Sequence, residues 1–143
     1  MNHTLKRNER VFIIALVIWL LLQLSRFIAL VLIQEINVGV ETPAWMFPAY
    51  LDMFAAILAL PLTVMVWKAR GFLTWSFIVI YLAISIIDHI GNFVTTDLVG
   101  PPSIVPEGSN PILFPAIMTV FDTIFIIMLF VPKYRDIFFK ITE

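Results

Sequence analysis

The sequence predicts an all-α, membrane-spanning four-helix bundle with both ends in the cytoplasm. Of its 143 residues, 61 % are hydrophobic and 13 % are charged, whereas ordinary soluble domains have about 45–50 % and about 25 %. Four apolar stretches cover residues 11–33, 48–67, 72–94 and 111–131, and each is close to the roughly 20 residues that a helix needs to cross a bilayer. These stretches lack the alternating pattern of a barrel, so residues 1–143 should form a single transmembrane domain.

The first stretch follows the basic residues Lys6, Arg7 and Arg10, as the core of a secretory signal also does. It runs from residue 11 to residue 33, which is longer than the about 7–15 residues of a signal core, and no small-x-small cleavage site follows it. We therefore expect a permanent transmembrane helix.

The connections contain the residues that interrupt helices. Glycine and proline occur in both long connections, residues 34–47 and 95–110, whereas residues 68–71 are too few for anything but a tight antiparallel hairpin. Pro61 and Pro115 lie inside apolar stretches, and there they predict local kinks or weakened helical turns.

Basic residues mark one side of the membrane. They precede the first stretch, occupy the short link and follow the fourth stretch: Lys6, Arg7, Arg10, Lys68, Arg70, Lys133, Arg135 and Lys140. Because the two long connections have none, the positive-inside rule places both ends in the cytoplasm. Trp67 and Trp75 should then lie at the inner headgroups and Trp45 at the outer ones.

The tail, residues 132–143, carries apolar side chains at helical spacing, namely Tyr134, Ile137, Phe138 and Ile141. Charged residues lie between them, as in a helix that rests on a membrane surface. We expect such an interfacial helix on the cytoplasmic side. The alternative is a frayed end of the fourth span.

The composition limits the partners. The net charge of -1 provides no basic surface for nucleic acid, and the absence of cysteine excludes disulfides and thiolate metal sites. No G-x-S-x-G, H-E-x-x-H or glycine-rich phosphate loop occurs, so no catalytic motif is found. The expected partners are the lipid bilayer and either another membrane protein or a second copy of the chain, and not nucleic acid.

His89 lies inside an apolar stretch, whereas His3 is far away in the N-terminal tail. A haem or zinc site built from two histidines is therefore not available within the chain. We expect no cofactor and no metal, and a hydrogen-bonded structural role for His89.

Four ionisable residues interrupt the apolar stretches: Arg26, Asp52, Asp88 and Asp122. A charge at the bilayer centre costs at least about 2.5–3.5 kcal/mol, so such residues face a protein interior or a wet cavity. At 1.5 Å per residue, Arg26 lies ~22 Å and Asp88 ~24 Å from the inner edge, and Asp52 lies roughly 6 Å below the outer edge. The three side chains are expected at one height, with the guanidinium between two carboxylates.

Neighbouring residues define the inward faces. Ser85, Asp88, His89 and Asn92 share one face of the third span at i, i+3, i+4 and i+7 spacing, and Gln23 precedes Arg26 by one turn. Small side chains of the second span, Ala55, Ala56 and Ala59, should allow close helix packing. Asp122, about 16 Å from the start of the fourth span, has no obvious cationic partner, which favours its protonated form.

Two interpretations of these candidates stay open: Arg26, Asp52, Asp88, His89, Asn92 and Asp122. The first is a buried ion network that fixes the register of the helices. The second is an outward-facing polar pocket or proton-linked site, in which His89 and Asp122 titrate.

Three segments resemble a family of small, uncharacterised bacterial four-helix integral membrane proteins. They are the arginine of the first stretch with its neighbours (Leu22, Arg26, Phe27), the run FPAYLD at residues 47–52 after Pro43, and the run ALP at residues 59–61. Asp88, Asn92 and the proline-rich connection into Phe114 and Pro115 look like that family's third and fourth helices. The resemblance implies a prokaryotic cell membrane and a pairing of Arg26 with Asp52, and no particular chemistry.

These observations favour a small accessory or structural subunit of a membrane assembly, because four short helices leave little room for a catalytic cavity. The alternative is an outward-facing binding or transport module for a small polar ligand or protons, which uses the intramembrane arginine and aspartates. An intramembrane enzyme is the third hypothesis.

Overall fold

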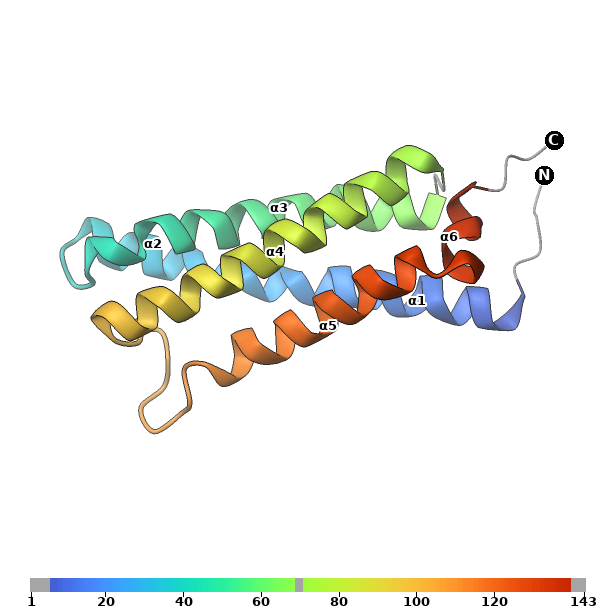
Figure 1. Ribbon diagram of the computed structural model, residues 1–143. Helices are drawn as coiled ribbons and strands as arrows, with labels where there is room; N and C mark the ends of the chain where they lie inside the picture. Colours follow the sequence, from blue (N-terminus) through green and yellow to red (C-terminus); the bar gives the residue numbers. More distant parts are fainter. Residues whose placement is uncertain (1–5, 69–70, 140–143) are drawn as a thin grey trace.

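The computed structural model describes residues 6–68 and 71–139, and this part of the chain is helical with no strand. Its helices are long and apolar enough to cross a membrane in four places: Arg7–Asn37, Pro43–Lys68, Phe72–Val99 and Leu113–Phe130. They run side by side in one elongated bundle (Figure 1). The predicted all-helical fold, with four helices that are long and apolar enough to span a membrane, is confirmed.

The first span consists of three consecutive helical segments, a division that the sequence did not predict. The α-helix α1, Arg7–Leu22, passes into the 3₁₀-helix η1, Gln23–Ile28, and then into α2, Ala29–Asn37. A 3₁₀-helix has three residues per turn, so side chains three apart point the same way. In η1 this places Gln23 and Arg26 on one side.

The other spans are longer or shorter than predicted by a few residues. A short 3₁₀-helix, η2 (Pro43–Trp45), leads into α3, Met46–Lys68. The third span, α4 (Phe72–Val99), continues to Val99 rather than ending at residue 94. It stops there because Gly100 adopts a φ of 87°, which favours glycine. The fourth span, α5, is Leu113–Phe130.

The two internal prolines differ in their effect. α3 continues through Pro61, whose side chain is exposed. Pro115 is the third residue of α5, in the first turn, where a backbone N–H has no partner within the helix. The prediction of a weakened turn at Pro115 is therefore wrong, because the helix begins later than the apolar stretch does.

The core has a larger and a smaller part. The larger part includes Leu16, Leu20, Ile78, Leu82 and Leu129, each fully buried between the spans. The smaller part lies beside α2 and consists of Ala29, Leu32, Ile36, Trp45 and Ala49.

Trp45 belongs to the smaller part of the core and is only 3 % exposed. The prediction that it faces the outer headgroups is therefore wrong, because α2 and α3 enclose the indole. By contrast, Trp67 is 57 % exposed, as an interfacial tryptophan would be.

Alanines let α3 approach its neighbours. Ala55, Ala56 and Ala59 are at most 3 % exposed, and α3 packs against α1, η1 and α4. The Tyr81 hydroxyl of α4 donates to the Ala55 carbonyl oxygen at 3.2 Å. The predicted small-residue face is confirmed.

The tail forms a separate helix, α6, Pro132–Phe139. Val131 is extended, with ψ of 125°, so α6 is not a frayed end of α5, and that alternative is wrong. Its apolar side packs on the bundle, where Ile137 and Phe138 are buried. Its position on a membrane surface stays a prediction, and Ile141 lies outside the described residues, as do His3, Arg70 and Lys140.

One end of the bundle gathers the start of α1, the end of α3, the start of α4 and α6 (Figure 1). The described basic residues of the connections are at this end: Lys6, Arg7, Arg10, Lys68, Lys133 and Arg135. The opposite end holds η2, the end of α4 and the loop that leads into α5 (Figure 1). The geometry therefore separates a basic end from a non-basic end.

Replacement of Ala59 by leucine should destabilise the bundle by about 1–3 kcal/mol, because the added methyl groups have no room between packed helices. Ile57→Leu is the matched control, since residue 57 is 52 % exposed on the same helix. Thermal unfolding in one detergent measures both variants. Equal midpoints for the two would contradict the close approach of α3.

Candidate functional site

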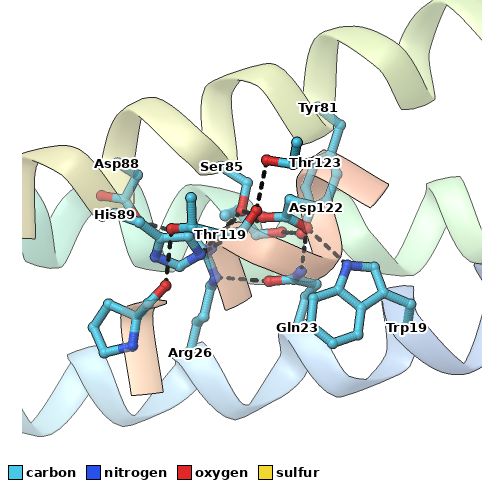
Figure 2. A network of polar contacts seen from close by, with 12 residues as sticks. Trp19, Gln23, Arg26, Tyr81, Ser85, Asp88, His89, Thr119, Asp122 and Thr123 are labelled. Carbon is cyan, nitrogen blue, oxygen red and sulfur yellow. Dashed lines mark hydrogen bonds and ion pairs between the residues drawn. The ribbon is translucent and has the colours of Figure 1, made fainter. Parts of the chain in front are cut away.

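A cluster of buried polar side chains occupies the interior between the spans (Figure 2). Arg26 of η1 is at its centre and is only 3 % exposed. Its Nε donates to Oε1 of Gln23 at 2.8 Å, three residues earlier. The 3₁₀ geometry favours this bond because it aligns side chains three residues apart. The 3₁₀ segment η1 therefore helps to orient the guanidinium of Arg26.

Two carboxylates hold Nη1 of Arg26. Oδ2 of Asp88, from α4, lies at 2.8 Å, and Oδ1 of Asp52, from α3, lies at 3.2 Å. Asp88 is 1 % exposed, whereas Asp52 is 22 % exposed at the edge of the cluster. The sequence-based prediction that Arg26 lies between these two aspartates is confirmed.

Asp122 of α5 joins the same cluster. Its Oδ1 accepts hydrogen bonds from Nε1 of Trp19 at 2.7 Å and from Nε2 of Gln23 at 3.2 Å. Its Oδ2 accepts a hydrogen bond from the Ser85 hydroxyl at 2.6 Å. The donors to the carboxyl are all neutral, in agreement with the expectation that Asp122 has no cationic partner of its own. Nε2 of His89 lies 3.6 Å from Oδ2.

Ser85 and His89 connect the two halves of the cluster from one face of α4. Nη2 of Arg26 donates to the Ser85 hydroxyl and contacts Nε2 of His89 at 2.6 Å. A guanidinium can only donate, so Nε2 of His89 must accept. The proton of the neutral imidazole is therefore on Nδ1.

Arg26 has five partners. Nε and Nη1 donate to Gln23 and Asp88, Nη2 contacts Ser85 and His89, and Nη1 also forms an ion pair with Asp52. The carboxyls of Asp52, Asp88 and Asp122 outnumber this cation. Within the described ranges no group of three or more His, Cys, Asp or Glu side chains could hold a metal ion.

A cavity of about 580 Å³ adjoins the cluster on the side of the non-basic end. Its polar wall includes Arg26, Asp52, His89 and Asn92. Its remaining walls come mainly from apolar residues and prolines of η1, α2, the loop before α5 and the first turns of α5: Ile28, Leu32, Pro102, Ile104, Val105, Pro106, Pro111, Leu113, Phe114, Pro115 and Ile117. The loop and α5 enclose one side, and the first and third spans the other.

Hydrogen bonds between connections fix the loop over this cavity. The backbone N–H of Ser103 donates to Oε2 of Glu41 at 2.8 Å, and the Ser103 hydroxyl donates to Glu35. Glu41 also accepts from the backbone N–H of Thr42 at 2.6 Å. Partial burial of Glu41 opposes ionisation, but these hydrogen bonds outweigh it and hold its pKa below the usual 4.5.

Three buried polar atoms lack a hydrogen-bond partner within the described residues: Nε1 of Trp45, Nδ1 of His89 and Oδ1 of Asp88. Trp45 and His89 both line the cavity, whereas Asp88 does not. Such atoms are rare in folded proteins because each loses its bond to water without replacement. All three atoms are enclosed by the protein, each with less than 1 Å² of accessible surface.

The sequence-predicted residues separate into two groups. Arg26, Asp52, Asp88, His89 and Asp122 come together in the cluster. Asn92 lines the cavity instead and takes no part in the cluster. Two threonines near Asp122 on α5, Thr119 and Thr123, bind backbone carbonyl oxygens of their own helix, at 2.8 Å each.

Two tryptophans of the site were missed. Trp19 precedes Gln23 by four residues and Arg26 by seven, so helical spacing could have placed the three on one face. Nothing in the local sequence could have revealed the burial of Trp45, because that depends on the packing of α2 against α3.

Comparison of the chain with protein families, with curated proteins and with solved structures finds no match.

Replacement of Arg26 by leucine should lower the free energy of unfolding by about 3–5 kcal/mol, because it leaves Asp52 and Asp88 without a cation in an apolar interior. Arg10→Leu removes an exposed arginine of the same span and should have little effect. Thermal unfolding of both variants in detergent measures the difference. Equal stability would remove the case for the network.

Glu41 should stabilise the loop in a pH-dependent way. Because its pKa is lowered on folding, its contribution is present above the unfolded value and is lost as the pH falls through the folded one. The difference in Tm between the native chain and Glu41→Gln should be constant near neutral pH and shrink below about pH 4.5. The control is Glu107→Gln, an exposed carboxyl of the same loop. A difference that persists unchanged to about pH 3 would contradict the assignment.

Proposed function

We propose that this chain is a binding module that receives a small molecule in the cavity beside its arginine and aspartate cluster. The observation that carries the proposal is the cavity of about 580 Å³ with Arg26, Asp52, His89 and Asn92 in its wall. Ligand pockets typically measure about 300–1,000 Å³ and combine apolar walls with a few polar groups.

The cluster gives this cavity a rigid wall. Arg26 is held by hydrogen bonds and ion pairs from α3, α4 and its own segment, and Asp122 brings in α5. A side chain fixed from several helices loses little freedom on binding, which favours affinity. The excess of carboxyls over arginine also supports linkage of binding to protons.

The proposal includes the orientation of the bundle in the membrane. The described basic residues of the connections lie at the opposite end of the bundle from the loop over the cavity (Figure 1), which by the positive-inside rule puts both ends of the chain in the cytoplasm. The cavity then lies toward the non-cytoplasmic surface. A prokaryotic inner membrane, and membership of the bacterial family that the sequence resembles, are proposed on the resemblance alone.

A second candidate function is an accessory or structural subunit of a larger assembly. The exposed surface of α5 favours this candidate. In the most apolar 18-residue window of each span, 22 % of α5 is buried inside the bundle, whereas 39 % of the first span is buried. Such a face meets either lipid or a helix of another chain. Cross-linking in native membranes, followed by measurement of the complex mass, separates this candidate from a monomeric binding module.

A tryptophan at position 117 should fill the cavity and abolish retention of its ligand. Ile117 lines the cavity, whereas Ile124 lies two turns further along the same face of α5, outside the cavity, and the two are 45 % and 43 % exposed. Ile124→Trp is therefore the matched control. Mass spectrometry of organic extracts from the three purified proteins should find a compound in the native chain and in the control, reduced several-fold in Ile117→Trp. Identical extracts from all three would contradict the proposal.

A further inference from the structure

One side of the cavity is built from exposed apolar side chains, in contrast to its buried opposite wall. Leu32 and Trp45 line that opposite wall and are at most 4 % exposed. Four other lining residues, from η1 and the first turns of α5, are 45–58 % exposed: Ile28, Leu113, Phe114 and Ile117. These four residues form what we call the open side of the cavity.

The packing of the helices explains this opening. α5 packs mainly against α4 and α6, whereas α2 packs against α3 and η1. In Figure 1 the start of α5 accordingly stands apart from α2. The first span and α5 therefore leave space between them toward the non-basic end.

Aromatic side chains close the same gap nearer the basic end. The ring of Trp19 has its centroid 5.0 Å from that of Phe121 and 6.0 Å from that of Phe125. Beyond these rings the first span presents the smaller Ser25 and Ile28 to the cavity. The opening therefore begins where the large rings end.

The open side lies at the depth of lipid chains in a bilayer. Ile28 is nine residues before the end of the first span and Ile117 is four residues after the start of α5, so they lie ~14 Å and ~6 Å from these helix ends at 1.5 Å per residue. The loop at the non-basic end is tied down, since the Ser103 N–H donates to Glu41 at 2.8 Å and Ile104 packs on the smaller part of the core. The bilayer therefore offers the less obstructed route into the cavity.

The polar wall favours a ligand that donates hydrogen bonds. Asp52 is 22 % exposed, whereas Arg26 and His89 in the same wall are 3 % exposed. A carboxylate accepts hydrogen bonds and repels an anion. Asn92, half-buried in this wall, has no hydrogen-bond partner among the described residues. A hydroxyl or ammonium group thus finds two acceptors here, the Asp52 carboxylate and the Asn92 amide oxygen.

On the basis of the proposed function, we infer that the cavity takes a lipid-borne molecule sideways from the bilayer, between η1 and the first turns of α5. Its apolar chain lies against the open side, and its head donates hydrogen bonds to Asp52 and Asn92. Two classes of membrane molecule share this chemistry, those with a hydroxyl head and those with an ammonium head.

Photo-cross-linking of the full-length protein in nanodiscs tests this inference. The probes are hexadecanol and hexadecylamine with a diazirine in the middle of the chain, and peptide mass spectrometry locates the modified residues. Cross-links to the open side should fall several-fold when the unlabelled parent compound is added, because it displaces bound probe. Cross-links to Ile124, 43 % exposed and outside the cavity, should persist, because there the probe reacts from the bulk lipid.

Two compounds without a donor test the head. Hexadecyl methyl ether and hexadecyltrimethylammonium keep the chain but cannot donate, so they should compete about tenfold more weakly than hexadecanol and hexadecylamine, the factor for one hydrogen bond. Asn92→Leu should reduce this preference, and the variant should fold because Asn92 takes no part in the ion network. Asn37→Leu is the control, since Asn37 is exposed on α2 and outside the cavity.

The outcomes separate the inference from the proposed function. If Ile117→Trp removes a compound from the organic extracts but no cross-link to the open side is competed, the cavity binds a ligand and entry from the bilayer is wrong. Competed cross-links on Pro106, Ser109 or Asn110 instead of the open side also overturn it, as does equal competition by compounds with and without a donor. Failure of both experiments overturns both proposals. Displacement by hexadecanol alone supports a hydroxyl head, and displacement by hexadecylamine alone supports an ammonium head.

Discussion

The guanidinium of Arg26 is a cation that can only donate hydrogen bonds, and it is only 3 % exposed inside the bundle. Its five N–H groups must therefore find partners from the protein. The partners come from its own segment, from α3 and from α4, and Ser85 passes the network on to Asp122 of α5. One side chain thus fixes the relative height and rotation of all four spans, because none can slide or turn without breaking a charge-assisted contact.

The rest of the fold brings the helices close enough for these contacts. Alanines on α3 bring its backbone near the first span, so that Asp52 reaches Arg26. The 3₁₀ segment η1 turns Gln23 and Arg26 to the same side, where an α-helix would separate them by 60°. The threonines of α5 bind their own backbone and leave the interior to Asp122. Packing and hydrogen bonding thus support one arrangement.

The buried network and the cavity share residues, because Arg26, Asp52 and His89 belong to the network and also line the cavity. Most side chains of the network are hydrogen-bonded, such as Gln23, Ser85 and Asp122, as expected of structural polar groups. The unpaired buried atoms of the described residues are Oδ1 of Asp88 inside the network, and Nε1 of Trp45 and Nδ1 of His89, whose residues line the cavity. The interpretation as a buried ion network and the interpretation as a pocket therefore describe adjoining parts of one structure.

The sequence by itself determined the four long apolar helices and the matching heights of their charges, because helix length and rise per residue depend only on helix geometry. Equal depth was enough to pair Arg26 with Asp52 and Asp88. Only the tertiary structure decided that Asp122 joins them, that the first span tightens at η1, and that Trp45 is buried beside a cavity. These features depend on the rotation of each helix about its axis and on the path of the connecting loops. Both are set by contacts between residues far apart in the chain, and no local pattern contains them.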